Sequence, residues 1–303
     1  MDSLFPDRCA GALVGLACGD AVGTSVEFER RGTFPRVTDM LGGGPFDLEP
    51  GQWTDDTSMA LCLAESLLVK GGFDAYDQMA RYTKWWRDGH LSSTGECFDI
   101  GLTVSAAIRR FLETDDPFSG STRPDTAGNG ALMRLAPVVL FFYPDLEKVQ
   151  HYAVESSRTT HAAPEALDAT RLLAHVLGNA LGGRPKPAVL DASELALGSP
   201  KLASLTRGDY LAKDIAEIRG SGYAVASLEA ALWCFATTST FESAVLEAAN
   251  LGDDADTTAA IVGQIAGAHY GIDAIPAEWR ERLHMGQQIE LMARQLARFG
   301  GAA

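Results

Sequence analysis

Carboxylate and hydroxyl side chains gather at the start of two apolar segments that lie far apart in the sequence. The first acidic segment is residues 54–57 (TDDT), followed by the largely apolar residues 58–68. The second acidic segment is residues 252–258 (GDDADTT), followed by the apolar residues 259–263. Acids placed beside apolar surface destabilise a fold unless a cation or strong hydrogen bonds compensate them. We therefore expect the two segments to meet in the fold and to hold a pair of divalent metal ions.

The spacing of the acids within each segment suits metal binding. Adjacent side chains on a helix diverge by about 100°, so Asp55 and Asp56 could each face a different ion. In a turn or an extended segment, Asp254 and Asp256 point the same way, which favours bridging or chelation of a cation. Four carboxylates would balance the charge of two dications.

The expected ligand set consists of oxygen atoms alone, because Thr54 and Thr257 add neutral donors and neither segment contains Cys or His. Such a set selects Mg²⁺, Mn²⁺ or Ca²⁺ rather than zinc or copper. Two such ions about 3.5–4 Å apart can orient a diol or a phosphate and position a water molecule for attack.

Helix capping is the alternative interpretation of these acids. Thr or Asp commonly caps a helix, and acids in its first turn complement the helix dipole. One Asp would suffice for a cap, whereas the first acidic segment has two, so the local sequence leaves both interpretations open. A cap or a solvated charge is also the alternative for Asp20 and Glu27, which flank a glycine bend, and for His161, which precedes a helix start.

Small residues recur along the first predicted helix, residues 7–23, where Gly11, Gly15 and Gly19 are four positions apart. Glycine lowers helix stability, so several glycines on one helix usually permit close packing against another backbone or a ligand. A dinucleotide-binding fingerprint is excluded, because the strand before the glycines and the acidic residue after a second strand are both missing.

Residues 128–130 (Gly-Asn-Gly) have two interpretations. They could expose backbone N–H groups to an anion at a helix start, or they could form an ordinary turn. Pro137 is then expected to break or kink the helix that follows. Asp99 is another acid at the start of an apolar helix, which runs to about Leu112.

The composition limits the partners and the location of the protein. The 25 Lys and Arg against 40 Asp and Glu give a net charge of −15. Such a surface repels nucleic-acid phosphates and anionic lipid, so we expect neither nucleic acid nor membrane as a partner. The five cysteines are scattered, as in buried thiols of a reducing compartment. No charged-then-apolar leader is present, and no apolar run approaches the roughly 18 residues of a membrane span. We expect a cytoplasmic protein.

Helical patterns dominate the whole chain, with no alternating strand pattern and no internal repeat. We expect ten or more helices and essentially no sheet, since 46% of the 303 residues are hydrophobic and small residues favour tight helix packing. The predicted fold is therefore all-α, with residues 1–303 in a single compact domain around a central binuclear metal cleft. We expect this domain to be a monomer.

The order of these motifs resembles the ADP-ribosylglycohydrolase family over nearly the whole chain. Each motif is weak evidence alone. Six or seven motifs in the order of the family favour the interpretation of the acids as metal ligands over their interpretation as helix caps. The matching residues are 19–23 with Glu27, 51–57, 98–101, 128–130 with Met133 and Arg134, Thr160 and His161, Gly222 and Tyr223, and 250–261. One departure is Asp253 and Ala255, where many relatives carry Gly and Thr, and Asp253 has no assigned role.

The resemblance implies an all-helical fold with two Mg²⁺ or Mn²⁺ ions and a set of site residues. The implied metal ligands are Thr54, Asp55, Asp56, Asp254, Asp256 and Thr257. The implied substrate contacts are Asp99 at the ribose, Gly128, Asn129, Gly130 and Met133 at the diphosphate and distal ribose, and His161 and Tyr223 elsewhere. The implied catalytic carboxylates are Glu27, Asp55, Asp56, Asp99 and Asp254.

The resemblance also implies hydrolysis of the bond between C1″ of ADP-ribose and a protein side chain, with free ADP-ribose as product. The metals would grip the ribose hydroxyls, and Glu27 or an Asp ligand would activate water as the sugar gains oxocarbenium character. We expect arginine-linked mono-ADP-ribose on proteins as substrate. The alternatives are a serine-linked or other O-linked substrate, a non-catalytic ADP-ribose-binding protein and a two-metal phosphohydrolase; ADP-ribosylated DNA stays open.

Overall fold

Helices account for the regular structure of the chain, as the sequence predicts. The computed structural model describes residues 3–300, and in that range only isolated β-bridges accompany the helices. The α-helices are α1 (Phe5–Gly23), α2 (Asp55–Lys70), α3 (Ala75–Asp88), α4 (Leu102–Thr114), α5 (Ala136–Phe142), α6 (Leu146–Arg158), α7 (Pro164–Leu181), α8 (Lys186–Leu190), α9 (Pro200–Thr206), α10 (Ala224–Thr237), α11 (Phe241–Ala249), α12 (Ala255–Tyr270), α13 (Ala277–Arg282) and α14 (Gly286–Gly300). The expected all-α fold is confirmed, while the expected domain limits of 1 and 303 lie outside the described residues.

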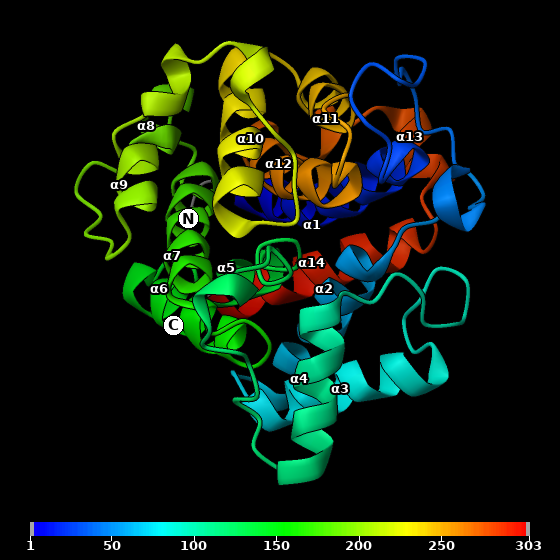
Figure 1. Ribbon diagram of the computed structural model, residues 1–303, viewed down its shortest axis with the longest axis vertical. Helices are drawn as coiled ribbons and strands as arrows, with labels where there is room; N and C mark the ends of the chain where they lie inside the picture. The colour runs from blue at the N-terminus through cyan, green and yellow to red at the C-terminus, as the bar shows by residue number, and fades with distance from the viewer. Residues whose placement is uncertain (1–2, 301–303) are drawn as a thin grey trace.

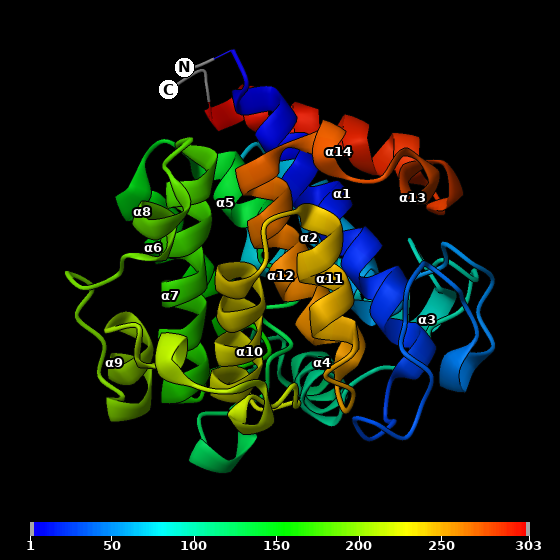
Figure 2. The same ribbon diagram turned by 90° about the horizontal axis from the view of Figure 1, so that it is seen from above.

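Helices α1 and α12 pack backbone to backbone at the centre of the protein (Figures 1 and 2). A Cβ atom added to Gly11 would lie 2.2 Å from the carbonyl oxygen of Gly267, and one added to Gly15 would lie 2.4 Å from that of Gly263. Side chains at these positions would overlap the neighbouring helix. The glycines predicted to allow close packing therefore contact another backbone.

The pairing of α1 with α12 is antiparallel, which decides where the acidic residues meet. As the contacts advance by four residues along α1, they retreat by four along α12, until a Cβ at Gly23 would lie 2.4 Å from the carbonyl oxygen of Ala255. The last turn of α1 therefore lies against the first turn of α12. This contact brings Asp20 and the turn that follows α1 beside Asp256.

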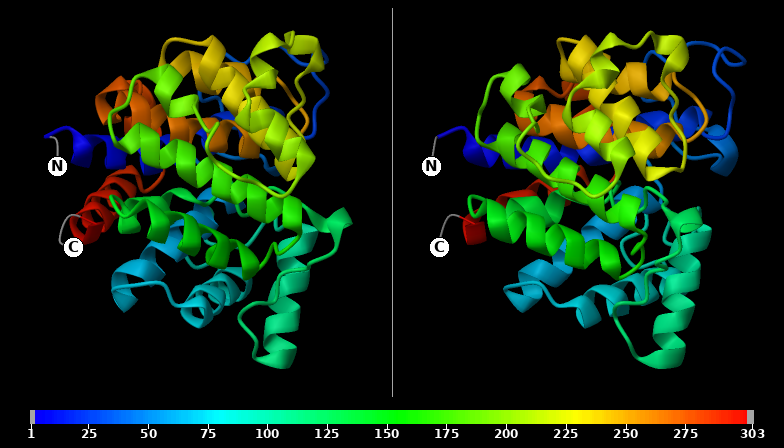
Figure 3. Two further views of the ribbon diagram at one scale, coloured as in Figure 1. Left: turned by 90° about the vertical axis from the view of Figure 1, so that its left-hand side faces the viewer. Right: turned by 60° about the vertical axis from the view of Figure 1, so that its left-hand side comes forward.

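The other helices surround this central pair. Helix α14 packs against α1, α2 and α5, while α11, α10 and α7 pack against α12 (Figure 2). Helices α3 and α4, coloured cyan to blue-green, lie at one end of the molecule (Figure 3). They share a smaller hydrophobic cluster with α2, which includes Met59, Met79, Tyr82, Trp85 and Ile108. The aromatic stripe of α3 therefore lies in the core.

One helix has the length and apolar composition of a membrane span, contrary to the expectation that no apolar run approaches that length. The span is Phe5–Val26, and 94% of its most apolar window is buried inside the protein. The expectation failed because the helix reaches a mean hydropathy of 1.4 although Asp20 interrupts its apolar residues. A core helix passes the same test, and α1 lies in the core against α12 and α14.

We predict that Gly15→Ala destabilises the protein. Alanine is the better helix former by about 1 kcal/mol, but its Cβ would lie 2.4 Å from the Gly263 carbonyl oxygen and 2.9 Å from the Phe241 ring. We expect a net loss of about 1–3 kcal/mol in the free energy of unfolding, measured with denaturant. Gly72→Ala is the control, because a Cβ there meets nothing within 4 Å. Equal stability of the two variants would show that α1 and α12 do not touch in solution.

Candidate metal centre and substrate cavity

The two acidic segments converge at the junction of α1, α2 and α12. The Thr54 hydroxyl lies 3.3 Å from Oδ2 of Asp256, and the Thr257 hydroxyl donates to Oδ1 of Asp56 over 3.2 Å. Both contacts are buried and join residues about two hundred positions apart in the chain. Helix α2 starts at Asp55 and α12 at Ala255, so these contacts bring the two helix starts together.

The start of α2 is capped by Asp20, which belongs to α1. Asp20 is buried and accepts hydrogen bonds from the backbone N–H and the hydroxyl of Thr54, at 2.9 Å each. It also accepts from the N–H of Thr57 at 3.0 Å and its hydroxyl at 2.6 Å. Neither Thr54 nor Asp254 caps its own helix through its side chain. The prediction of a side-chain cap is therefore wrong for both helices, whereas Asp55, Asp56 and Asp256 do lie in the first turns, where acids complement the helix dipole.

Several buried carboxylate oxygens have no hydrogen-bond partner among the described residues. They are Oε2 of Glu27, Oδ2 of Asp56 and Oδ1 of Asp256. One oxygen from each of Asp20, Asp56 and Asp256 lies within 4.8 Å of the other two, and the same holds for Glu27, Asp99 and Asp256. Unpartnered buried anions are costly, and oxygen clusters of this kind suit hard divalent cations. The residues present therefore fit a centre of one or two such cations.

Burial raises the pKa of every carboxyl in this cluster, and repulsion between carboxylates adds to the shift of most of them. Burial raises the pKa values of Asp55, Asp56 and Asp256 well above their usual range, and the neighbouring carboxylates add to the shift. Burial and then the charge of Asp99 raise the pKa of Glu27 to about 10, and burial and then Asp20 raise the pKa of Asp99 to about 7. The cluster at neutral pH must therefore hold either protons or cations.

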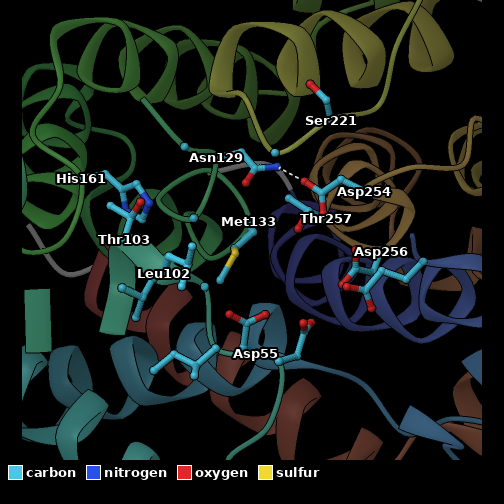
Figure 4. A pocket seen from close by; sticks show the side chains of 18 of the residues that line it. Asp55, Leu102, Thr103, Asn129, Met133, His161, Ser221, Asp254, Asp256 and Thr257 are labelled. Carbon is cyan, nitrogen blue, oxygen red and sulfur yellow. Dashed lines mark hydrogen bonds between the residues drawn. The ribbon is translucent and has the colours of Figure 1, made fainter. Parts of the chain in front are cut away.

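The cluster lies at one end of a cavity of about 770 Å³. Most of the predicted site residues line it. They are Glu27, Asp55, Asp99, Gly128, Asn129, Gly130, Met133, His161, Asp254, Asp256 and Thr257. Thr54 and Asp56 are fully buried behind the lining. In Figure 4, Asp256 and His161 lie on opposite sides of this cavity, with Asn129 and Met133 between them.

Asp99 and Asp253 enter the cavity from strained backbone. Both have left-handed φ angles, +57° and +56°, which glycine adopts without strain. The backbone of Asp253 is paired with Glu29 and Phe28 at 2.7 Å each, while its side chain is exposed. These backbone hydrogen bonds therefore hold position 253 in the left-handed conformation, and Asp is one of the few residues other than Gly that tolerate it.

The loop at residues 128–130 is a turn, so the alternative of a helix start is wrong. The N–H groups of Gly128 and Asn129 donate to the carbonyls of Thr126 and Gly222, at 2.8 and 3.1 Å. Helix α5 begins only at Ala136, and Pro137 lies in its first turn, where proline is favoured, and does not break it. The Asn129 side chain donates to Oδ2 of Asp254 at 2.6 Å, which ties the loop to the second acidic segment.

His161 and Tyr223 lie in different places. The His161 ring packs on the loop, because a Cβ at Gly130 would lie 2.6 Å from its Cε1 atom, and it does not cap α7. Tyr223 lines an adjoining pocket of about 550 Å³, where its hydroxyl donates to Glu165 and accepts from Lys201 at 2.8 Å. The two pockets share Gly128, Gly222 and Thr103, so Tyr223 borders the main cavity without lining it.

Known proteins resemble this chain over most of its length. The profile of the ADP-ribosylglycohydrolase family matches residues 1–302. The chain is 43% identical over 290 residues to ADP-ribosylarginine hydrolase Tri1 of Serratia proteamaculans, which covers 96% of this chain and 79% of that protein. It is 32% identical to ADP-ribosyl-[dinitrogen reductase] glycohydrolase of Rhodospirillum rubrum, over 94% and 93% of the two chains. A solved structure described as an ADP-ribosylglycohydrolase-related protein complex superposes with a TM-score of 0.88 at 45% identity, covering 99% of this chain and 100% of that one.

We predict that the protein, kept free of divalent cations by a chelator, loses stability as the pH rises. The folded pKa values of Glu27 and Asp99, about 10 and about 7, exceed their ordinary values of 4.5 and 3.8. The folded state therefore retains protons that the unfolded chain releases. This contribution to the free energy of unfolding is complete below about pH 4. As the pH rises, the part that comes from Asp99 is lost through about pH 7, and the part that comes from Glu27 is lost toward about pH 10. Thermal unfolding between pH 5.5 and 8.5 measures it.

Added Mg²⁺ or Mn²⁺ should raise the unfolding temperature more at pH 8.5 than at pH 5.5, because protons compete with cations for the carboxylates. Asp256→Asn should flatten the pH dependence and reduce the effect of the cation. Asp273→Asn is the matched control, since the Asp273 side chain is 91% exposed. A pH dependence that is the same in all three proteins would contradict the electrostatic account of the cluster.

Proposed function

Because the chain belongs to the ADP-ribosylglycohydrolase family, we propose that it is a metal-dependent hydrolase that removes mono-ADP-ribose from arginine side chains of proteins. The observation that carries the proposal is the convergence of two distant acidic segments at one end of a cavity of about 770 Å³. Relatives at 43% and 44% identity, from Serratia proteamaculans and Pseudomonas putida, are both named ADP-ribosylarginine hydrolases. These names support arginine as the acceptor.

Two divalent cations, Mg²⁺ or Mn²⁺, complete the proposed site. The residues that would hold them are Thr54, Asp55, Asp56, Asp254, Asp256 and Thr257, with Asp20 close to Asp56 and Asp256. Asp256 belongs to both groups of converging carboxylates, so it would contribute to holding a cation at either group. When bound, such cations supply positive charge that offsets the carboxylates and polarises sugar hydroxyls and water.

The proposed reaction exchanges one bond at C1″ of the ribose. The bond from C1″ to the guanidine nitrogen breaks, a bond from C1″ to a water oxygen forms, and one water proton passes to the departing nitrogen. Glu27 is the proposed base for that water, because its Oε2 is buried, unpartnered and beside Asp99 and Asp256. Asp99 would orient the ribose and the leaving group from its position in the cavity wall.

The opposite side of the cavity would bind the rest of the ligand. The loop at 128–130, Met133 and His161 would hold the diphosphate and distal ribose, and Tyr223 would contact a portion that extends past Gly128. These neutral groups would bind an anionic ligand despite the net charge of −15. That charge disfavours nucleic acid and membrane as partners. We also propose that the protein is a cytoplasmic monomer with reduced thiols.

A release assay on matched substrates tests this function. Peptides that carry mono-ADP-ribose on arginine should yield intact ADP-ribose when Mg²⁺ or Mn²⁺ is present, and chelation should stop the release. Serine-linked peptides should react more slowly. Tight binding of ADP-ribose without release from any peptide would favour a binding protein instead. Release of AMP or phosphate would favour a phosphohydrolase.

We predict that Asp256→Ala lowers turnover of the arginine-linked peptide by more than about a hundredfold, since even residues that only orient metal ligands cost 10- to 100-fold when removed. Circular dichroism should show an unchanged helix content, because the substitution removes repulsion as well as a proposed ligand. Asp273→Ala, at an exposed carboxylate away from the cavity, should retain full activity. Near-normal turnover by Asp256→Ala would refute its assignment as a ligand.

A further inference from the structure

Arg134 is a buried cation that forms no ion pair with a described carboxylate. It is 1% exposed and lies behind the cavity, with its guanidinium over the Tyr82 ring at 4.9 Å. Burial of an unpaired charge lowers stability, so the contacts that this side chain makes must compensate for that cost. Its Nη1 donates to the carbonyl oxygen of Gly130 at 2.8 Å, and its Nη2 donates to the hydroxyl of Thr160 at 2.6 Å.

The Thr160 hydroxyl connects Arg134 to His161. Its oxygen lies 2.8 Å from Nδ1 of His161, and both groups are buried. A guanidinium can only donate, so the Thr160 oxygen accepts from Arg134 and its own hydrogen is left to donate. The only other described partner of this hydroxyl is Nδ1 of His161. If Nδ1 carried a hydrogen, the threonine hydrogen would be buried without an acceptor, at a cost of about 1–3 kcal/mol. Nδ1 therefore accepts.

The imidazole ring of His161 carries no charge, and its contacts fix its orientation. Burial and then the charge of Arg134 lower its pKa to about 3. With Nδ1 accepting, the single ring hydrogen lies on Nε2. The backbone is fixed too, because the His161 N–H donates to Ser157 at 2.7 Å and its carbonyl accepts from the Ser157 hydroxyl at 2.8 Å. The ring lines the cavity, and Nε2 has no hydrogen-bond partner among residues 3–300.

We propose that Arg134 is a positioning residue, which acts through Thr160 to fix the hydrogen of His161 on Nε2 and to present it to an acceptor oxygen of the ligand. Through Gly130, the same guanidinium holds the loop on which the ring rests. The identity of the ligand as ADP-ribose, whose diphosphate and riboses offer such oxygens, rests on the function proposed above. His161 and Asp256 are on opposite sides of the cavity (Figure 4), so the hydrogen bond should serve binding more than bond cleavage.

Nitrogen-15 NMR of the ligand-free protein tests the orientation without any assay of activity. In the wild type, Nδ1 of His161 should resonate as an unprotonated nitrogen that accepts a hydrogen bond, and Nε2 as a protonated one. His161→Gln identifies the signals among those of the six histidines. Thr160→Val, which keeps the shape and removes the hydroxyl, should shift the Nδ1 resonance to that of a free nitrogen or of a tautomer mixture. A protonated Nδ1 in the wild type would overturn the proposal.

Binding and kinetics then test the role of Arg134. Thr160→Val and Arg134→Gln should each weaken ADP-ribose binding about tenfold, as the loss of one well-oriented hydrogen bond does, and should raise KM more than they lower kcat. Arg134→Lys should restore part of the affinity, because lysine can still donate to Thr160. Thr83→Val is the control, since the buried Thr83 hydroxyl donates only to its own helix, to Met79 at 2.9 Å.

The outcomes separate this proposal from the function on which it rests. Unchanged ADP-ribose affinity in folded Thr160→Val, or an effect equal to that of Thr83→Val, would overturn the positioning role even if the enzyme is active. If Arg134→Gln does not fold, Thr160→Val alone decides. The reverse result, with the NMR signature and the loss of affinity observed but no release of ADP-ribose from any peptide, would overturn the hydrolase and leave the positioning role intact.

Discussion

The direct backbone contact between α1 and α12 is the constraint on which the rest of the structure depends. With glycine at Gly11, Gly15 and Gly263, the two helices approach more closely than any side chain would allow. Their antiparallel alignment then fixes the last turn of α1 against the first turn of α12. Asp20 is held beside Asp256, and through Asp20 the start of α2 is held there as well. Tight packing of apolar helices thus determines where the polar chemistry lies.

The free-energy cost of bringing these carboxylates together in the interior is concentrated at one end of the cavity. Asp20 is well compensated, by four hydrogen bonds from Thr54 and Thr57. Glu27, Asp56 and Asp256 each keep an oxygen without a partner among the described residues, and their pKa values rise because burial and like charges oppose ionisation. Sites with such shifts are commonly functional, since structural burial alone favours hydrogen-bonded or paired groups. The neutral donors of the opposite wall complement this anionic end.

Much of the fold could be predicted from the sequence, because helical periodicity and acid clusters at helix starts are local signals. The all-α class and the close packing along α1 are of this kind. Contacts between distant residues could not be predicted in the same way. Asp20 looks like a local cap or a surface charge, but it caps a different helix, and nothing near it in the sequence identifies Thr57 as its partner.

The remaining differences have similar physical causes. The sequence gives no sign that Arg134 contacts Thr160 and Gly130. Tyr223 lies in an adjoining pocket because its hydroxyl bonds to Glu165 and Lys201. Pro137 lies in the first turn of α5 and does not break a helix, because the chain before α5 is a turn. The first helix reads as a membrane span by composition alone, and only its neighbours show that its apolar surface is buried inside the protein.

The unpartnered oxygens of Glu27, Asp56 and Asp256 also have an evolutionary consequence. A neutral side chain at one of these positions removes repulsion from the interior, so selection for durability and selection for catalysis oppose each other there. A gene copy released from its catalytic role can therefore drift toward neutral residues at the centre while the glycine-lined helix pair preserves the fold. Long-lived, inactive descendants are an expected outcome of this architecture.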